Sequence, residues 1–334
     1  MNDGEEYRNP NMVGSEEEED TMNGCLDLTG FQLHDLSEVD IPETLVELDL
    51  TTNRLSIIDP RIGLLTCLKK LSFRQNLLKD DGVSPISNWA AISGLEELIF
   101  RDNHLKNLPD VSIFKSLLVF DVSYNEIFSL SGLSNASNTI KEFYASKNEI
   151  TKMVELDHLH ELQILELGSN HLRVMECLEN MKNLQELWLG RNRIKTVNLC
   201  GLKCIKKISL QSNRLTSMTG FQECHALEEL YLSHNGIAKM EGLSGLQNLH
   251  VLDVSSNKLT SVDDIEKLTM LDDLWLNDNQ IATLDGFGMA VAGSRERLTT
   301  IYLERNPCAR LPNYATTLRE VFSNLLQIDS DVLS

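Results

Sequence analysis

Cysteine and histidine residues in the second half of the sequence are the first candidates for chemistry. Cys200 and Cys204 are separated by three residues, and Cys224 and His225 follow further along the chain. Side chains of these types can hold a tetrahedral zinc ion. We favour a structural role instead, because Cys204 and Cys224 each stand shortly before a hydrophobic strand motif, where small side chains fill the core. We therefore predict no metal site here.

Other potential active-site patterns are incomplete. His158 and His160 lack a third ligand nearby in the sequence. The glycines between Gly286 and Gly293 do not form the Gly-x-Gly-x-x-Gly pattern that opens a nucleotide-binding helix. The chain has no nucleophile elbow, no P-loop and no paired acid and base. We expect no catalytic residue, no metal and no cofactor, and we predict that this protein is not an enzyme.

Charge and hydropathy exclude several classes of partner. The chain of 334 residues has a formal net charge of −20, which would repel nucleic acid phosphates. No apolar run is long enough to cross a membrane, and the N-terminus lacks the basic and then apolar pattern of a signal peptide. The seven cysteines are scattered and odd in number, which indicates free, mostly buried thiols in a reducing compartment. We expect a soluble intracellular protein that binds neither nucleic acid nor membranes.

Residues 1–24 differ in composition from the rest of the chain. They hold eight acidic residues, five of them consecutive from Glu16 to Asp20, and a single base, Arg8. Such a segment buries too little apolar surface to offset the entropy of ordering. We predict a disordered acidic tail that solubilises the protein. A phosphorylated or partner-docking tail is the alternative.

A leucine-rich repeat dominates the remaining sequence. The template Leu-x-x-Leu-x-Leu-x-x-Asn-x-Leu, with apolar replacements, matches twelve times between Leu45 and Cys308, and the last copy is degraded. Successive template asparagines are 21 to 27 residues apart, and most are 22 apart. Periods of this length indicate a leucine-rich-repeat solenoid. The asparagines are Asn53, Asn76, Asn103, Asn125, Asn148, Asn170, Asn192, Asn213, Asn235, Asn257, Asn279 and Asn306.

Each position of the repeat has a physical role. The Leu-x-Leu core forms a short strand whose alternate side chains point inward, and stacked repeats bury a continuous core. The asparagine amide can satisfy backbone groups that the following turn would otherwise bury unpaired. Apolar residues spaced by three then suit 3-10 or short helical turns. We predict an α/β fold, a horseshoe of about 12 repeats of 22 residues with a parallel β-sheet on its concave face and short helices on its convex face.

Two repeats are longer than the others, and the ends of a solenoid need caps. The 27-residue steps, Asn76 to Asn103 and Asn279 to Asn306, predict longer convex loops or helices. Residues 25–33 resemble a half repeat with Phe31 in the asparagine position, and apolar residues at helical intervals predict an amphipathic capping helix over 314–326. The predicted parts are a tail (1–24), the repeats with an N-terminal cap (25–297), and the last repeat with a C-terminal cap (298–334).

The concave face is the predicted binding site, because side chains between the inward leucines point into the hollow. One outward column contains five aromatic residues interleaved with acids, including two of the three tryptophans, and a neighbouring column adds further acids. Strand propensity explains few of these rings, whereas exposed aromatic anchors surrounded by charge are typical of protein interfaces. Twelve strands at about 4.8 Å give an arc of roughly 50 Å, which fits a folded domain. The aromatic residues of the first column are Tyr144, Trp188, Tyr231, Trp275 and Tyr302, and the acids of the two columns include Asp121, Glu166, Asp253 and Asp273.

The 22-residue repeat, the acidic N-terminus, the terminal cap and the concave column resemble the leucine-rich-repeat nuclear regulatory subunit of protein phosphatase 1, the protein phosphatase 1 regulatory subunit 7 family. The resemblance covers residues 25–334. It implies a non-catalytic subunit that controls the maturation, activity or targeting of the phosphatase. Its acidic and aromatic concave residues would bind the catalytic subunit, and the corresponding residues of this sequence are Asp121, Tyr144, Glu166, Trp188, Asp253, Asp273, Trp275 and Tyr302. It also implies a role in mitosis and the cell cycle, a nuclear location with a cytoplasmic fraction, and a complex that a third, inhibitory subunit can join.

The repeat alone also resembles the spliceosomal U2 A′ protein, which leaves a second hypothesis open. In that case the chain is a ribonucleoprotein scaffold whose hollow holds one helix of a small RNA-binding-domain protein. Twelve repeats and strong acidity favour the larger phosphatase with a basic surface patch. We therefore expect Trp188, Trp275 and Tyr302 to act as anchors for the phosphatase.

Overall fold

The computed structural model describes residues 24–333, and the acidic tail expected for residues 1–24 lies, apart from Gly24, outside this part of the chain. The described chain forms two compact units. Unit 1 extends to Asn125 and includes Asn135–Ser137, while unit 2 comprises Glu126–Ser134 and the chain from Asn138 onward. The division falls directly after Asn125 and again within a short 3-10 helix, η4 (Leu133–Asn135), and the repeat pattern gives no sign of it.

Unit 1 is a stack of turns built on five three-residue strands. They are β1 (Cys25–Asp27), β2 (Glu47–Asp49), β3 (Lys70–Ser72), β4 (Glu97–Ile99) and β5 (Val119–Asp121). Each strand pairs in parallel with the next one along the chain. The connections contain η1 (Pro60–Leu64), α2 (Asp80–Val83), η2 (Ser84–Asn88) and η3 (Ala90–Ile92). The last three lie between Asn76 and Asn103, where the longer repeat predicted additional structure.

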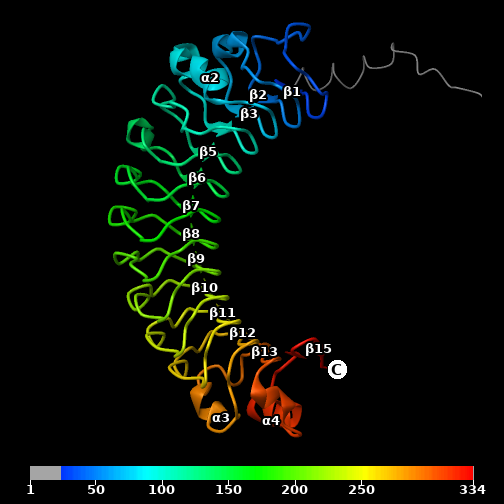
Figure 1. Ribbon diagram of the computed structural model, residues 1–334, viewed down its shortest axis with the longest axis vertical. Coiled ribbons are helices and arrows are strands. Elements are labelled where there is room, and N and C mark those ends of the chain that lie inside the picture. Colours follow the sequence, from blue (N-terminus) through cyan, green and yellow to red (C-terminus); the bar gives the residue numbers. More distant parts are fainter. Residues whose placement is uncertain (1–23, 334) are drawn as a thin grey trace, which may run out of the picture. The chain divides into compact units, whose positions relative to one another are not determined.

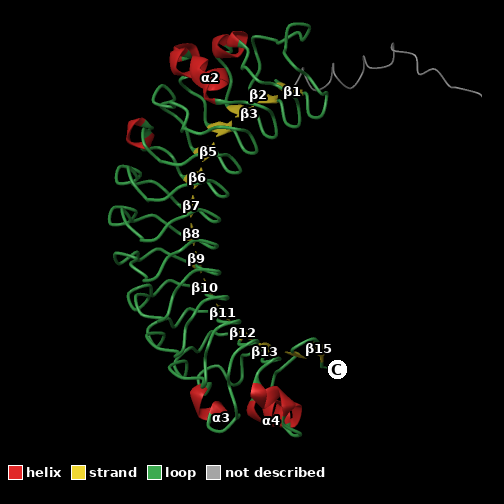
Figure 2. Cartoon of the chain, in the orientation of Figure 1, coloured by secondary structure: helices red, strands yellow, loops and turns green. Residues whose placement is uncertain are grey.

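Unit 2 repeats this architecture with eight parallel strands that pair in chain order. In Figure 1 these strands line the inner side of the curve of unit 2, and the connecting turns form its outer side. The second long repeat contains α3 (Phe287–Ala290), and most other connections are loops rather than the expected short helices (Figure 2). The predicted leucine-rich-repeat solenoid is therefore confirmed. The strands are β6 (Glu142–Tyr144), β7 (Ile164–Glu166), β8 (Glu186–Trp188), β9 (Lys207–Ser209), β10 (Glu229–Tyr231), β11 (Val251–Asp253), β12 (Asp273–Trp275) and β13 (Thr300–Tyr302).

Asn170 illustrates the role of the repeated asparagine. Its Nδ2 donates to the carbonyl oxygen of Leu167 in its own turn at 3.0 Å and to that of Ala145 in the preceding turn at 2.9 Å. Its Oδ1 accepts from the amide of Ile150 at 2.9 Å. Asn170 is buried, so each of these hydrogen bonds satisfies a group that water does not reach. The predicted role of the asparagine, to satisfy buried backbone groups, is confirmed. Its side chain also links two neighbouring turns.

The core of each unit lies between the strands and the outer turns. The middle residue of every strand from β2 to β13 is buried, and burial of a large apolar side chain stabilises the fold by about 1.5–3 kcal/mol. In unit 1 the inward rings of Phe73 and Phe100 stack with their centroids 5.4 Å apart. One repeat could not cover these side chains alone, so each turn depends on its neighbours.

Both ends differ in detail from the predicted caps. β1 pairs with β2 as a half repeat would, but Phe31 in the asparagine position is 53% exposed. A short 3-10 helix, η5 (Pro307–Arg310), precedes α4 (Tyr314–Val321), which begins where predicted but ends before residue 326 because Phe322 has an extended backbone. The chain then forms β14 (Gln327–Ile328), parallel to β13, and β15 (Asp331–Val332), antiparallel to β14. Phe322 and Leu325 are buried, but they flank a turn after the helix has ended, so their helical spacing was misleading.

The cysteines are less buried than expected. Of the seven, only Cys224 and Cys308 are buried, while Cys67 and Cys204 are exposed. The core-filling role expected for Cys204 is therefore wrong, because its side chain lies at the surface. Burial raises the pKa of Cys224 to about 11, so its thiol stays protonated. Within residues 24–333, no group of three or more His, Cys, Asp or Glu side chains is placed to hold a metal ion, and no helix there has the length and apolar character to cross a bilayer.

Candidate protein-binding site

The candidate site of unit 2 is the strand face, defined as the outward side chains of β6–β13. Each strand points its middle side chain to the core and its first and third side chains outward, and most of the outward residues are half-buried. The third residues of successive strands form one column, and the first residues form another. In-register pairing places Tyr231, Asp253, Trp275 and Tyr302 side by side in the third-residue column. The fold therefore brings together predicted contact residues that are far apart in sequence.

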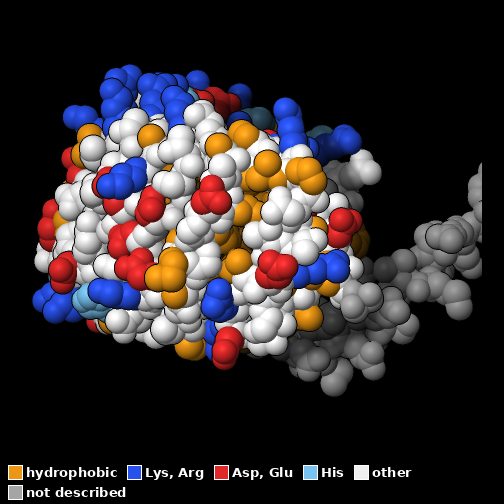
Figure 3. Space-filling view, turned by 90° about the horizontal axis from the view of Figure 1, so that it is seen from below, with side chains coloured by type: hydrophobic (Ala, Val, Ile, Leu, Met, Phe, Trp, Pro, Cys, Tyr) orange, Lys and Arg blue, Asp and Glu red, His pale blue; other side chains and the backbone are white. Residues whose placement is uncertain are grey.

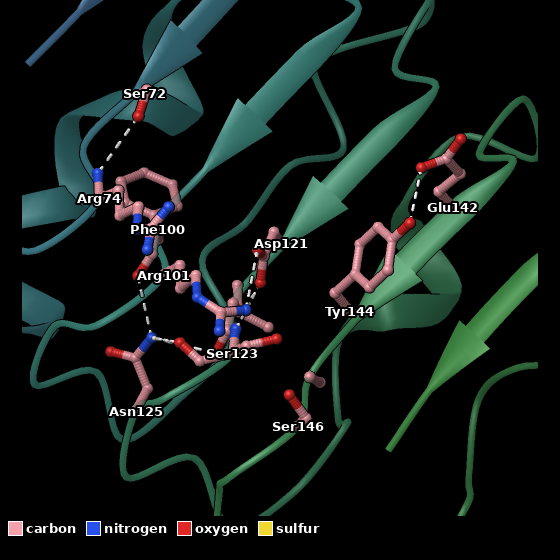
Figure 4. A network of polar contacts seen from close by, with 12 residues as sticks. Ser72, Arg74, Phe100, Arg101, Asp121, Ser123, Asn125, Glu142, Tyr144 and Ser146 are labelled. Atoms are coloured by element: carbon pink, nitrogen blue, oxygen red, sulfur yellow. Dashed lines mark hydrogen bonds and ion pairs between the residues drawn. The ribbon is translucent and has the colours of Figure 1, made fainter. Parts of the chain in front are cut away.

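Glutamates of the first-residue column hold the polar ends of aromatic rings in the third-residue column. Residues two apart on a strand point to the same face, so the carboxylate can reach the ring. The pKa of Tyr231 is raised mainly by burial and, to a smaller extent, by the hydrogen bond to the Glu229 carboxylate. The phenol therefore stays protonated and donates a hydrogen bond. These contacts fix the orientation of each ring in the free protein. The pairs are Tyr144 Oη with Glu142 Oε2 (2.8 Å; Figure 4), Trp188 Nε1 with Glu186 Oε2 (3.1 Å) and Tyr231 Oη with Glu229 Oε2 (2.8 Å).

Trp188 and Tyr231 form an aromatic pair although a strand separates them. Their ring centroids are 6.5 Å apart, with an angle of 21° between the planes. The intervening strand β9 carries Ser209 in the third-residue column, and this small residue is 1% exposed. Because Ser209 has no bulky side chain, the two rings can approach one another. The result is a continuous apolar surface over β8–β10, with a carboxylate at each polar end.

Trp275 and Tyr302 form a second aromatic pair with different polar contacts. Their rings meet edge to face at a centroid distance of 5.6 Å, and Tyr302 Oη accepts from Gln327 Nε2 at 2.8 Å. Trp275 Nε1 is buried and has no hydrogen-bond partner among the described residues. The residue two positions before it is Asp273, whose side chain is one methylene shorter than the glutamates of the other pairs. This difference in length explains why no carboxylate satisfies the indole of Trp275.

The predicted contact residues of unit 2 are not equally accessible. Glu166 and Asp273 are half-buried on the strand face. Asp253 is only 5% exposed, and its Oδ1 accepts from the amide and the hydroxyl of Ser255 at 2.9 and 2.6 Å. The main role of Asp253 is thus to fix the turn after β11. The five aromatic residues, expected to be exposed, are half-buried because they pack on their neighbours.

Asp121 is the predicted contact residue of unit 1, at the end of β5. Burial raises its pKa, although the hydrogen bonds of Ser123 and the charge of Arg101 oppose this effect. Asp121 Oδ1 accepts from the Ser123 amide at 2.8 Å, and Arg101 Nη1 lies 3.9 Å from Asp121 Oδ2 (Figure 4). The Arg101 guanidinium also lies 4.4 Å from the ring centroid of Tyr124, which is 45% exposed. Tyr124 is a further candidate contact residue, which the outward columns of the sequence did not include. Its position, an aromatic residue directly before the repeat asparagine Asn125, could have indicated it.

A protein of Arabidopsis thaliana, the protein phosphatase 1 regulatory inhibitor subunit PPP1R7 homolog, is similar to this chain over its whole length. The two are 64% identical over 328 residues, which cover 96% of this chain and 100% of the relative. The chain belongs to this family of regulatory subunits. The family resemblance inferred from the repeat and the concave column is therefore confirmed.

The repeat and the fold are also found in more distant proteins. The family model for leucine-rich repeats (2 copies) matches residues 225–267. A leucine-rich-repeat protein of Leptospira interrogans is 25% identical, with a TM-score of 0.70 over 89% of this chain and 81% of that chain. An internalin, InlF, of Listeria monocytogenes is 18% identical, with a TM-score of 0.71 over 87% of this chain and 88% of that chain. These structures share the solenoid fold.

Proposed function

We propose that this protein is a non-catalytic regulatory subunit of protein phosphatase 1 and that the strand face of unit 2 binds the phosphatase catalytic subunit. The observation that carries the proposal is the presence of two aromatic pairs, Trp188 with Tyr231 and Trp275 with Tyr302, on one sheet lined by carboxylates. Such residues are enriched among those that dominate binding energy. The Arabidopsis relative is named as a protein phosphatase 1 regulatory inhibitor subunit, which suggests the partner.

The charge and size of the strand face support a folded partner with a basic surface. Glu142, Glu166, Glu186 and Asp273 lie on the face, and its Lys207 pairs with Glu229. Complementary charge speeds association and selects the partner. Eight strands at about 4.8 Å span about 34 Å, which exceeds the width of a single helix or peptide. On unit 1, we retain Asp121 as a proposed contact.

Truncation of Trp275 tests the proposed site. Trp275→Ala should weaken binding of the purified catalytic subunit, measured by isothermal titration calorimetry, by about 2–4 kcal/mol. Because the ring packs on Tyr302, the same change should lower the free energy of unfolding by about 1–2 kcal/mol, more than expected for a freely exposed residue. Unfolding is therefore measured in parallel, and binding is compared well below the unfolding transition.

Phe128→Ala is the matched control for Trp275→Ala. Phe128 is an aromatic residue of unit 2 that is 54% exposed and lies outside the strand face. Its truncation should leave the affinity unchanged. If Trp275→Ala binds as tightly as the unsubstituted protein, or if both variants lose affinity equally, the strand face is not the binding site.

The cellular part of the proposal concerns what binding does to the phosphatase. We infer control of its maturation, activity or targeting in the nucleus during mitosis, with a smaller cytoplasmic fraction. Phosphatase assays on a phosphorylated protein, with and without this chain, give the sign of the effect. Affinity purification from nuclear extract should recover the catalytic subunit, and a third, inhibitory subunit would be recovered with it. Recovery of a small RNA-binding-domain protein instead would support the ribonucleoprotein scaffold.

A further inference from the structure

We propose that unit 2 has a second interaction surface, a basic edge that binds an acidic protein segment. The basic edge consists of the three successive turns that follow β7, β8 and β9, residues 168–175, 190–197 and 211–218. These turns contain no Asp or Glu, although the chain has a net charge of −20. Their lysine and arginine residues are Arg173, Arg191, Arg193, Lys195 and Arg214.

Backbone hydrogen bonds stack the basic residues of successive turns. The amide of Arg193 donates to the carbonyl oxygen of Leu172 in the preceding turn, and the amide of Arg214 donates to that of Ile194, each at 2.8 Å. Equivalent positions of neighbouring turns therefore repeat at about 4.8 Å, the spacing of the strands. Because all strands of β6–β13 are parallel, these turns lie at the same edge of the sheet. The basic edge is thus a row of regularly spaced cationic side chains on hydrogen-bonded turns.

The cations of the basic edge are not neutralised within the described chain. None of the five forms an ion pair with a residue in 24–333, whereas Lys206, Lys207 and Arg297 of the same unit each pair with a carboxylate. Arg193 is half-buried and the other four are exposed. Figure 3, the view from below, shows that Lys and Arg side chains of the molecule gather at its upper edge. The unpaired positive charge of the five basic-edge residues attracts anions.

The dimensions and neighbours of the basic edge favour a short acidic peptide segment. Three turns span about 10 Å, the length of about three extended residues. Arginine guanidinium groups can donate two parallel hydrogen bonds to one carboxylate. The adjacent strand face carries Glu166 and Glu186, which repel a broad anionic surface such as a nucleic acid or a bilayer. A narrow run of Asp or Glu can follow the basic edge without meeting those carboxylates.

A peptide-binding assay on the full chain tests the basic edge. The probe is a fluorescein-labelled peptide of consecutive glutamates, followed by fluorescence anisotropy, and its glutamine counterpart is the control probe. The double variant Arg191→Gln with Arg193→Gln should bind the glutamate peptide about tenfold more weakly. Binding to the unsubstituted protein should also weaken as salt is added.

The matched control is Lys182→Gln with Lys203→Gln, which removes two exposed cations of unit 2 outside the basic edge. This control should retain the affinity of the unsubstituted protein. Equal binding of the two peptides, or equal losses in the two double variants, overturns the proposal. Tighter binding of single-stranded DNA or of phosphatidylserine vesicles than of the peptide overturns the choice of an acidic protein segment.

Measuring how each variant binds the phosphatase catalytic subunit and the glutamate peptide distinguishes this proposal from the proposed function. Arg191→Gln with Arg193→Gln should leave binding of the catalytic subunit unchanged, because neither residue lies on the strand face. Trp275→Ala should leave binding of the glutamate peptide unchanged for the corresponding reason. Failure of either surface therefore leaves the test of the other intact.

Discussion

Replacing Asp273 with glutamate should supply the hydrogen bond that the indole of Trp275 lacks. Trp275 Nε1 is buried without a partner among the described residues, whereas Trp188 Nε1 donates to Glu186 Oε2 at 3.1 Å. The two tryptophans occupy the same position on their strands, and the acidic residue precedes each by two. One additional methylene at position 273 therefore brings a carboxylate oxygen to the place that Glu186 provides for Trp188.

The expected gain follows from the cost of an unsatisfied buried donor. That cost is about 1–3 kcal/mol, and a hydrogen bond to a charged acceptor contributes a similar amount. Fixing the longer glutamate side chain costs part of this gain in rotamer entropy. We expect Asp273→Glu to raise the free energy of unfolding by about 1 kcal/mol. Glu186→Asp should lower it by a similar amount, because it recreates at Trp188 the arrangement now found at Trp275.

Urea unfolding followed by far-UV circular dichroism measures both changes. The midpoint should rise for Asp273→Glu and fall for Glu186→Asp, with similar slopes if the extent of unfolding is the same. The double variant should lie near the unsubstituted protein, because the two sites are not in contact. A lower midpoint for Asp273→Glu, or an unchanged midpoint for Glu186→Asp, would refute the argument that side-chain length decides whether the indole is satisfied.

Two further substitutions, one of them with a matched control, test the stability of the fold. Asn170→Ala should lower the free energy of unfolding by about 2–4 kcal/mol, because it leaves several buried backbone groups unpaired. The exposed Asn183→Ala, which removes one hydrogen bond to His160, should cost under about 1 kcal/mol, and equal losses in urea would contradict this role of the repeat asparagine. The pKa of Asp121 is raised above 3.8 by burial, so its stabilising contribution is present at low pH and lost as pH rises through the raised value. Asp121→Asn should thus match the unsubstituted protein in stability at about pH 3 and be more stable than it at about pH 7. A less stable variant at neutral pH would contradict the sign.

Most of the fold could be predicted because the repeat sets the register of every turn. The asparagine and leucine positions placed each strand from β2 to β13 correctly, since one template assigns the inward and outward residues together. The end of α4 was not predictable in this way. Phe322 and Leu325 are buried as helical spacing implied, but the helix ends at Val321, and a turn leads the chain into β14, which pairs with β13. A contact with a distant strand thus overrides a local pattern.

The strand face could be predicted as a set of columns but not as a set of contacts. Alternation on a strand placed Trp188 and Tyr231 outward, whereas their stacking depends on the small size of Ser209 between them. The sequence predicted Asp253 as an outward acidic residue of the column. It did not predict that the Asp253 carboxylate accepts hydrogen bonds from Ser255 in the turn after β11. Columns follow from the period of the sequence, while burial and hydrogen bonding depend on side-chain size and on neighbouring turns.

The same periodicity places opposite charges on different surfaces of one chain. Because every turn repeats the same backbone, a residue type that recurs at one template position forms a line along the solenoid. Acidic and aromatic residues recur at the strand positions, and unpaired basic residues recur in the turns after β7–β9. The net charge of −20 conceals this separation, since the basic edge contains no acid at all. A basic partner on the strand face and an acidic segment on the basic edge would therefore be attracted to different parts of unit 2, and neither would need to displace the other.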